Sequence, residues 1–182
     1  MQFLPTRIPD VVLIEPAVYH DQRGFFMETF HDGRFDAAGL NLDIRQDNHS
    51  RSHRGVLRGL HYQRRNPQGK LVRVTRGAIF DVAVDLRRSS STFGQWTGVI
   101  LDDQRHQQLW VPPGFAHGFL VLSDVADVIY RCTALYAPGD EHTLLWNDPD
   151  VGIDWPTVDS NQPLLSAKDE QGVRLADAVV YD

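Results

Sequence analysis

Ten residues organise the rest of this chain: Arg54-Gly55-Val56-Leu57-Arg58-Gly59-Leu60-His61-Tyr62-Gln63. In an extended strand the side chains alternate between two faces, so Leu57 and His61 share one face and Arg58 lies on the other. Glycine weakens a strand unless the backbone must bend there or a ligand must approach it. We therefore expect either a ligand-binding strand or a core strand with a glycine bulge and a hydrogen-bonded histidine. A single site would need both Arg58 and His61, and either a bulge or twist at Gly59 or a ligand that wraps around the strand end would provide this.

Strand patterns recur along the chain at short, regular spacing, with glycine and proline turns between them. The clearest pattern alternates cleanly, and its expected buried face comprises Phe80, Val82, Val84 and Leu86. Long helical patterns are absent, which favours an all-β antiparallel sandwich or barrel over alternating strands and helices. Other strands are expected at 11–16, 70–75, 94–101, 107–111, 118–122 and 125–134.

Two short helices are expected at the periphery. The first covers residues 32–38, with Asp32 as its N-cap and Gly39 just past its end. The second begins at Ser166, because Ser166 and Asp169 have the spacing of a capping box. Asp169 is then either a helix cap or, by folding back, the carboxylate that orients His61.

The chain length predicts one domain over residues 1–182, with N-terminal strands in 1–30 and a C-terminal helix and tail in 160–182. Hydrophobic residues make up 42% of the chain, which is ordinary for a globular protein. No apolar run approaches the length of a membrane span, and the first residues lack a signal-peptide pattern. The single Cys132 excludes an internal disulfide and a cysteine-based metal cluster. We expect a cytoplasmic protein.

Charge is unevenly spread along the chain. The net charge is −6, yet nine of the eighteen Lys and Arg residues lie between Arg45 and Arg76, against the single acid Asp47. A local cationic segment in an acidic protein is poorly suited to a nucleic acid and suits a small anion such as a diphosphate. The alternative is a solvated basic face.

A second motif supports the barrel and reads Pro112-Pro113-Gly114-Phe115-Ala116-His117-Gly118-Phe119. Pro-x-Gly-x-x-His is the second signature of the cupin β-barrels, in which the histidine often binds a metal. The first cupin signature supplies His-x-His, but here it reads His61-Tyr62-Gln63, so the second histidine is missing. A metal site needs three or four ligands, and we expect no metal here.

Other side chains are candidates for catalysis or for substrate binding. His61 titrates near neutral pH and is a candidate base, with Arg58 and Lys70 as cations that would stabilise a developing oxyanion. Tyr130 either packs in the core or donates a proton into a barrel cavity. Tyr136 lies in a loop, where its ring is available to stack on a flat base.

With these residues assembled, the chain resembles the dTDP-4-dehydrorhamnose 3,5-epimerases of dTDP-rhamnose biosynthesis. The resemblance runs from about Ile14 to Asp169. Its specific motifs are Asp21-x-Arg23-Gly24-x-Phe26-x-Glu28, Gln46-Asp47-Asn48-x-Ser50, residues 55–63, Gln68-Gly69-Lys70-Leu71-Val72-Arg73, the 112–119 motif and Leu165-Ser166-x-Lys168-Asp169. Six such motifs in the family's order are unlikely to arise by chance.

The resemblance implies a metal-free, cofactor-independent cupin jelly roll that forms a homodimer, with an N-terminal element crossing to the partner. The implied substrate is dTDP-4-dehydro-6-deoxy-D-glucose, which is epimerised at C3 and C5 next to its C4 ketone. The implied catalytic residues are His61 as base, Asp169 as its orienting partner, Tyr130 as acid and Lys70 at the enolate oxygen. The implied substrate-binding residues are Arg23, Glu28, Gln46, Asn48, Arg58, His117, Tyr136, Glu141 and Lys168.

Three competing interpretations remain. An epimerase acting at one carbon only shares nearly all these motifs. A cupin that binds a nucleotide sugar without turning it over is disfavoured, because binding needs no matched acid and base. A metal-dependent cupin oxygenase is disfavoured by the missing His-x-His. One departure from the family pattern is a loop between Gln63 and Lys70 that is about a residue shorter, which would shift Lys70 slightly.

Overall fold

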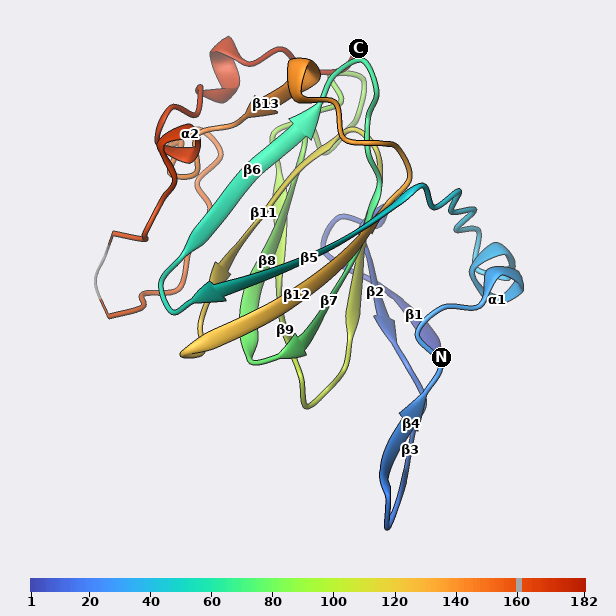
Figure 1. Cartoon of the computed structure of the whole chain (residues 1–182). Coiled ribbons are helices and arrows are strands. Elements are labelled where there is room, and N and C mark those ends of the chain that lie inside the picture. The colour runs from blue at the N-terminus through green and yellow to red at the C-terminus, as the bar shows by residue number, and fades with distance from the viewer. Residues whose placement is uncertain (160–161) are drawn as a thin grey trace.

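The computed structural model describes residues 1–159 and 162–182, and two antiparallel sheets dominate it (Figure 1). The six-stranded sheet has the order β1 (Gln2–Pro5), β2 (Val12–Glu15), β10 (Gln108–Val111), β7 (Lys70–Arg76), β12 (Val125–Cys132) and β5 (Gln46–His53). The five-stranded sheet has the order β13 (Glu141–Thr143), β6 (Leu57–Gln63), β11 (Phe115–Val121), β8 (Ala78–Asp85) and β9 (Trp96–Asp102). The predicted all-β jelly-roll barrel is confirmed, and so are the predicted strands. The division into a single domain stays a prediction.

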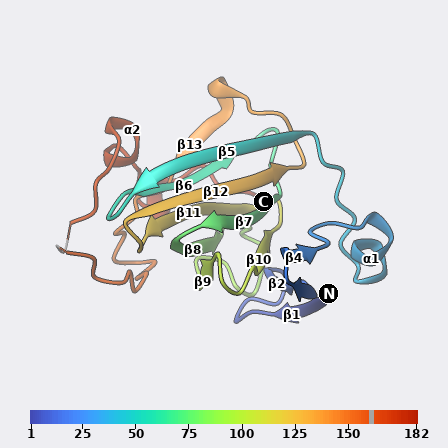
Figure 2. The same cartoon turned by 60° about the horizontal axis from the view of Figure 1, so that its bottom comes forward.

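The main core lies between the two sheets, as the turned view in Figure 2 shows for the stacked strands. It contains Val72 and Val74 from β7, Val128 from β12, and Ile79 and Ala83 from β8. These residues alternate with outward-facing ones along each strand, as a sandwich requires.

A second core covers the outer face of the five-stranded sheet. Val82 and Val84 of β8 pack there against Val151, Ala178 and Val180 of the C-terminal segment. The prediction that β8 has one buried face was therefore incomplete. Both of its faces are buried: the C-terminal segment covers the predicted face with Val82 and Val84, and the face that alternation alone would leave in water, with Ile79 and Ala83, packs between the two sheets.

The pairing of β6 with β11 contains a register shift. Arg58 lies opposite Phe119 and His61 lies opposite His117, so three steps along β6 match two along β11. Gly59, between them, has a φ of +118°. The extra residue reverses the alternation, so Arg58 and His61 face the same side. The simple two-face assignment was wrong, and of the explanations considered for a shared site the structure shows the irregularity at Gly59.

The helices are short and peripheral, as predicted. α1 spans Asp32–Ala37, but its N-cap position is His31, and the expected capping by Asp32 is wrong because Asp32 is already in the first helical turn. α2 spans Ala167–Glu170, and its N-cap Ser166 accepts a hydrogen bond from the Asp169 N–H, as predicted. Short 3₁₀ turns, η1 (Pro138–Asp140) and η2 (Leu175–Asp177), complete the set. Within residues 1–159 and 162–182, no helix is long and apolar enough to cross a membrane.

One hairpin projects from the barrel (Figure 1). It consists of β3 (Val18–Asp21) and β4 (Gly24–Met27), which pair only with each other among the described strands. Its aromatic residues are largely in solvent, with Tyr19 66% and Phe26 72% exposed.

Candidate active site

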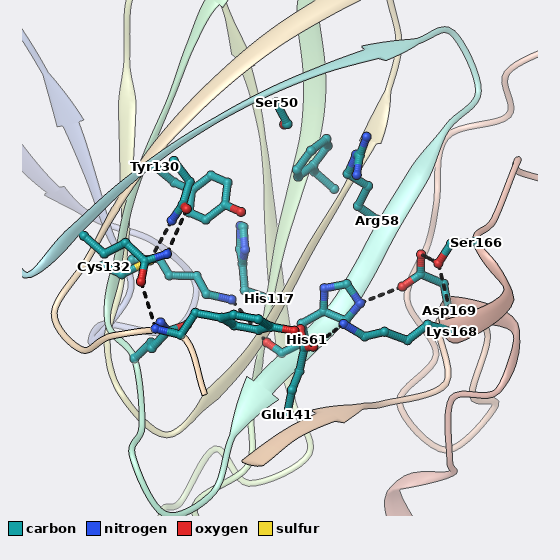
Figure 3. A pocket seen from close by; sticks show the side chains of 16 residues that line it. Ser50, Arg58, His61, His117, Tyr130, Cys132, Glu141, Ser166, Lys168 and Asp169 are labelled. Atoms are coloured by element: carbon teal, nitrogen blue, oxygen red, sulfur yellow. Dashed lines mark hydrogen bonds and ion pairs between the residues drawn. The ribbon is translucent and has the colours of Figure 1, made fainter. Parts of the chain in front are cut away.

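A cavity of about 420 Å³ opens into the barrel between the two sheets. Its walls come from β5, β7 and β12 of one sheet, β6 and β11 of the other, and β13, α2 and the η1 loop (Figure 3). The lining residues are Gln46, Asn48, Ser50, Arg58, His61, Gln68, Lys70, His117, Phe119, Tyr130, Cys132, Tyr136, Glu141, Ser166, Lys168 and Asp169. Every site residue expected from the sequence is among them except Arg23 and Glu28.

The His61 imidazole is paired with the Asp169 carboxylate, although the two residues lie 108 positions apart. His61 Nε2 is 2.6 Å from Asp169 Oδ1. The same oxygen accepts the backbone N–H of Gly59 at 3.2 Å, and the other oxygen accepts the Ser166 hydroxyl at 2.6 Å. The bulge that turns His61 into the cavity thus also presents an N–H to its carboxylate partner.

The charge states of this pair follow from its surroundings. Burial alone would raise the pKa of Asp169, but hydrogen bonds from His61, Ser166 and the Gly59 N–H outweigh it and lower the pKa to about 2. Burial lowers the pKa of His61, only partly opposed by Asp169, and the ammonium groups of Lys168 and Lys70 lower it further. His61 is therefore neutral at neutral pH.

The tautomer of His61 is set by its partner. An ionised carboxylate only accepts hydrogen bonds, so Nε2 carries the proton and Nδ1 holds the free lone pair. The second ring nitrogen points away from Asp169 and into the cavity (Figure 3). The arrangement leaves a base facing the place where a ligand would lie.

Lys70 lies deep in the cavity wall. Its Nζ donates to the His61 carbonyl at 3.3 Å, and the residue is 9% exposed. Burial lowers its pKa, while the negative charges of Glu141 and Asp81 partly offset the burial. Lys70 lines the cavity, where its ammonium is available to stabilise an oxyanion. That the preceding loop is about a residue shorter than the family pattern stays a prediction.

A second histidine–aspartate pair lies beside the first. His117 Nε2 is 2.8 Å from Asp81 Oδ1, and the two residues are 6% and 0% exposed. Among the described residues, Asp81 Oδ2 has no hydrogen-bond partner. The sequence prediction missed Asp81 because its place in the β8 alternation put it on the exposed face, and no sequence signal connects it to His117.

Tyr130 faces His61 across the cavity. It comes from β12 of the six-stranded sheet, whereas His61 comes from β6 of the five-stranded sheet, and Figure 3 shows them entering from opposite sides. Burial is the main cause that raises the pKa of the Tyr130 phenol. The phenol therefore keeps its proton at neutral pH and can act as an acid.

A carboxylate links two sides of the cavity rim. The Tyr136 hydroxyl donates to Glu141 Oε2 at 2.7 Å, and the Lys168 ammonium pairs with the same oxygen. Gln46 Oε1 accepts the Tyr136 N–H at 2.8 Å, and Gln46 Nε2 donates to Asn48 at 2.9 Å. The predicted substrate-binding residues of the rim are thus one connected set.

Two predicted binding residues lie away from the cavity of their own chain. Arg23, at the tip of the β3–β4 hairpin, pairs with Asp21 at 2.5 Å and is almost fully exposed. Glu28 follows β4, and its Oε1 lies 3.4 Å from Arg34 Nε. The structure of one chain does not bring these two residues to the other site residues.

The described residues contain no group of three or more His, Cys, Asp and Glu side chains arranged to hold a metal ion. His61 and His117 each direct one ring nitrogen to an aspartate instead of toward a shared point. The absence of a metal stays a prediction.

The comparisons with known proteins agree with this geometry. A family model described as dTDP-4-dehydrorhamnose 3,5-epimerase matches residues 5–177. A Pseudomonas aeruginosa protein of that name is 57% identical over 172 residues, which cover 94% of each chain.

Two solved structures extend the comparison. The dTDP-6-deoxy-D-glucose-3,5-epimerase of Legionella pneumophila, in complex with dTDP-4-keto-L-rhamnose, matches with a TM-score of 0.92 and 49% identity over 96% of this chain and 93% of that one. A 3′-monoepimerase from Streptomyces bikiniensis, in complex with dTDP-quinovose, has a TM-score of 0.88 and 40% identity over 94% of this chain and 87% of that one.

Proposed function

The chain belongs to the dTDP-4-dehydrorhamnose 3,5-epimerase family, and from that premise we propose how its own residues perform the reaction. It is an isomerase of dTDP-L-rhamnose biosynthesis that converts dTDP-4-dehydro-6-deoxy-D-glucose to dTDP-4-dehydro-L-rhamnose by inverting C3 and C5. The observation that carries the residue assignment is that His61 and Tyr130 enter one cavity from opposite sheets, with the buried Lys70 in the same cavity.

His61 is the base. The C4 ketone of the substrate acidifies the protons on C3 and C5, and His61 Nδ1 takes one of them while Nε2 stays bonded to Asp169. The electron pair left on carbon moves onto the C4 oxygen and forms an enolate. Lys70 stabilises that oxygen, because its ammonium is already desolvated and needs no rearrangement.

Tyr130 is the acid. Inversion requires the returning proton to arrive on the face of the sugar opposite to the base, and Tyr130 lies across the cavity from His61. Transfer of the phenol proton to the opposite face of the carbon restores the C4 ketone with that carbon inverted, and leaves His61 protonated and Tyr130 as a phenolate. A Tyr130→Phe variant should keep proton exchange from His61 while losing net epimerisation. Equal loss of both would contradict the acid role.

The rest of the cavity binds the nucleotide. Arg58 donates from Nε to Ser52 Oγ at 2.9 Å, which leaves its terminal N–H groups for the diphosphate. Tyr136 is half-exposed at the rim, where its ring is free to stack on thymine. Gln46, Asn48, His117, Glu141 and Lys168 provide the remaining polar contacts.

We also infer a homodimer in which the β3–β4 hairpin reaches the partner chain. The support is the hairpin's exposed aromatic residues and the position of Arg23 and Glu28, which bind substrate only if they enter a second chain's cavity. Analytical ultracentrifugation tests this inference, and a fully active monomer would contradict it. The cytoplasm is the proposed location, since the free Cys132 suits a reducing compartment.

The function is tested by incubating the protein with dTDP-4-dehydro-6-deoxy-D-glucose in deuterium oxide and following both carbons by NMR. Deuterium at C3 and C5 is the expected result. Deuterium at C3 alone would identify a monoepimerase like the one from Streptomyces bikiniensis. No exchange with binding intact would leave a nucleotide-sugar-binding protein. A chelator should leave the rate unchanged, and loss of activity would contradict metal independence.

A further inference from the structure

Ser166 makes two hydrogen bonds to Asp169, which is the carboxylate partner of His61. Its Oγ accepts the Asp169 N–H at 3.3 Å and donates to Asp169 Oδ2 at 2.6 Å. The first bond caps α2, a helix of only four residues. The second has no function in capping, because it ends on a side chain and leaves no helix N–H satisfied.

The second bond fixes the rotation of the Asp169 carboxylate. Oδ1 accepts from His61 and from the Gly59 N–H, while Ser166 is the one hydrogen-bond donor to Oδ2 among the described residues. Three donors from two separate elements, β6 at two points and the start of α2, hold the two oxygens. Without Ser166, rotation about the Cβ–Cγ bond of Asp169 is opposed at one oxygen only.

The direction of His61 depends on that carboxylate. The Nε2–Oδ1 bond of 2.6 Å is the side-chain hydrogen bond that the structure shows for the His61 ring. A tilt of the carboxylate therefore tilts the imidazole and moves Nδ1 away from the substrate carbon. Misplacement by about 1 Å can cost roughly a hundredfold in rate.

We propose that Ser166 is a positioning residue for the epimerisation, whose hydroxyl holds the Asp169 carboxylate at the angle that aims His61 at the substrate. The proposal rests on the function of His61 given above. It extends the histidine–aspartate pair to a relay of three residues, in which the serine is a donor to the carboxylate and no nucleophile. The same hydroxyl joins the folding of α2 to the assembly of the base.

The choice of variant distinguishes this positioning role of Ser166 from simple helix capping. Glycine caps a helix almost as well as serine but has no hydroxyl, so Ser166→Gly removes the donor and keeps most of the cap. Ser166→Thr keeps both functions. Ser166→Cys keeps the side-chain size with a much weaker donor and provides a second test if the glycine variant does not fold.

Two measurements are made on each variant. The first is the downfield proton NMR resonance of the His61 Nε2–H in the free protein, assigned by its disappearance in His61→Asn. The second is the split between kcat and KM for epimerisation. For Ser166→Gly we expect the resonance to shift or broaden and kcat to fall roughly 10–100-fold with KM within about twofold. Ser166→Thr should match the original protein, and Ser166→Cys should fall between them.

Other results would contradict the proposed role of Ser166. A Ser166→Gly or Ser166→Cys variant with the original resonance and kcat would overturn the proposal and leave Ser166 as a cap alone. A rise in KM with unchanged kcat would make Ser166 a binding residue instead. If the original protein showed no deuterium exchange, the proposed function would fail, but the resonance would still report whether Ser166 holds the pair.

Discussion

Two histidine–aspartate pairs lie side by side in this barrel, and they differ in how they are held. His61 and His117 are direct partners on β6 and β11. The inner pair, His117–Asp81, comes entirely from sheet strands and is almost completely buried. In the outer pair the His61 side chain is 25% exposed, and Asp169 comes from the one-turn helix α2.

We propose that this difference in burial and support gives the outer pair the role of a base and the inner pair a structural role. The outer carboxylate has donors at both oxygens, so it can stay charged while His61 gains and loses a proton. The inner carboxylate has one oxygen without a partner among the described residues, and its charge offsets the burial of Lys70. We therefore propose that the same two residue types transfer a proton in the outer pair and hold a fixed charge in the inner pair, and that their hydrogen-bond partners decide which.

Replacing the histidines gives the largest expected contrast. His61→Asn removes the base and should lower kcat by roughly 10³–10⁴-fold. His117→Asn should lower kcat/KM by only about 10–100-fold, mainly through KM, because the role proposed for His117 is substrate binding without proton transfer. Steady-state kinetics measures both, with the exposed His53→Asn as control. Equal losses of activity in His61→Asn and His117→Asn would contradict the assignment of different roles to the two histidines.

Replacing the carboxylates gives the next contrast. Asp169→Asn leaves His61 without an anionic partner and should lower kcat by roughly 10²–10³-fold. Asp81→Asn acts on His117 and Lys70 together, and we expect a loss of about tenfold. A larger loss from Asp81 than from Asp169 in the same assay would place the base at the inner pair.

The bulge that brings Arg58 and His61 together can be tested by stability. A Cβ at Gly59 would lie 2.6 Å from the Gly118 Cα, and the φ of +118° is unfavourable for alanine. Gly59→Ala should therefore lower the free energy of unfolding by roughly 2–4 kcal/mol in denaturant titration. Gly139→Ala, with no atom within 4 Å of the added Cβ, is the matched control and should change it by less than about 0.5 kcal/mol. Similar values for both would show that the bulge is not tightly packed.

The smallest effect is on pH dependence. If His61 is the base, its neutral form is the active form, and burial lowers its pKa below the ordinary 6.5. Activity should therefore persist at pH 6.5 and fall only as the pH drops through the lowered value. Asp169 favours protonated His61, so Asp169→Asn should move this acid limb to still lower pH. Asp81→Asn should leave it in place, and a shift from Asp81 alone would contradict the assignment.

Much of the fold was predictable because alternation and turn residues are local signals. The strands were found on that basis, and the cap at Ser166 was too. The second buried face of β8, with Ile79 and Ala83, was missed, since its burial depends on the opposing sheet, which packs against it through strands distant in the sequence. The direction of Arg58 was missed as well, because one extra residue at Gly59 reverses the alternation.

The site was predictable mostly through the family resemblance. Physical reasoning about the sequence identified His61 as a possible base, but it gave no means of placing Asp169 beside it across 108 positions. Asp81 was not found at all, because a carboxylate in an alternating strand is normally a solvent-facing residue. Arg23 and Glu28 lie outside the cavity of their own chain, so the proposal that they bind substrate requires a second chain.

The most direct test of the central claim is deuterium exchange at C3 and C5 in His61→Asn compared with His53→Asn. If His61 removes both protons, the His53 variant incorporates deuterium at both carbons at the original rate, and the His61 variant incorporates none while still binding dTDP. Exchange at either carbon at the original rate in His61→Asn would show that another residue is the base.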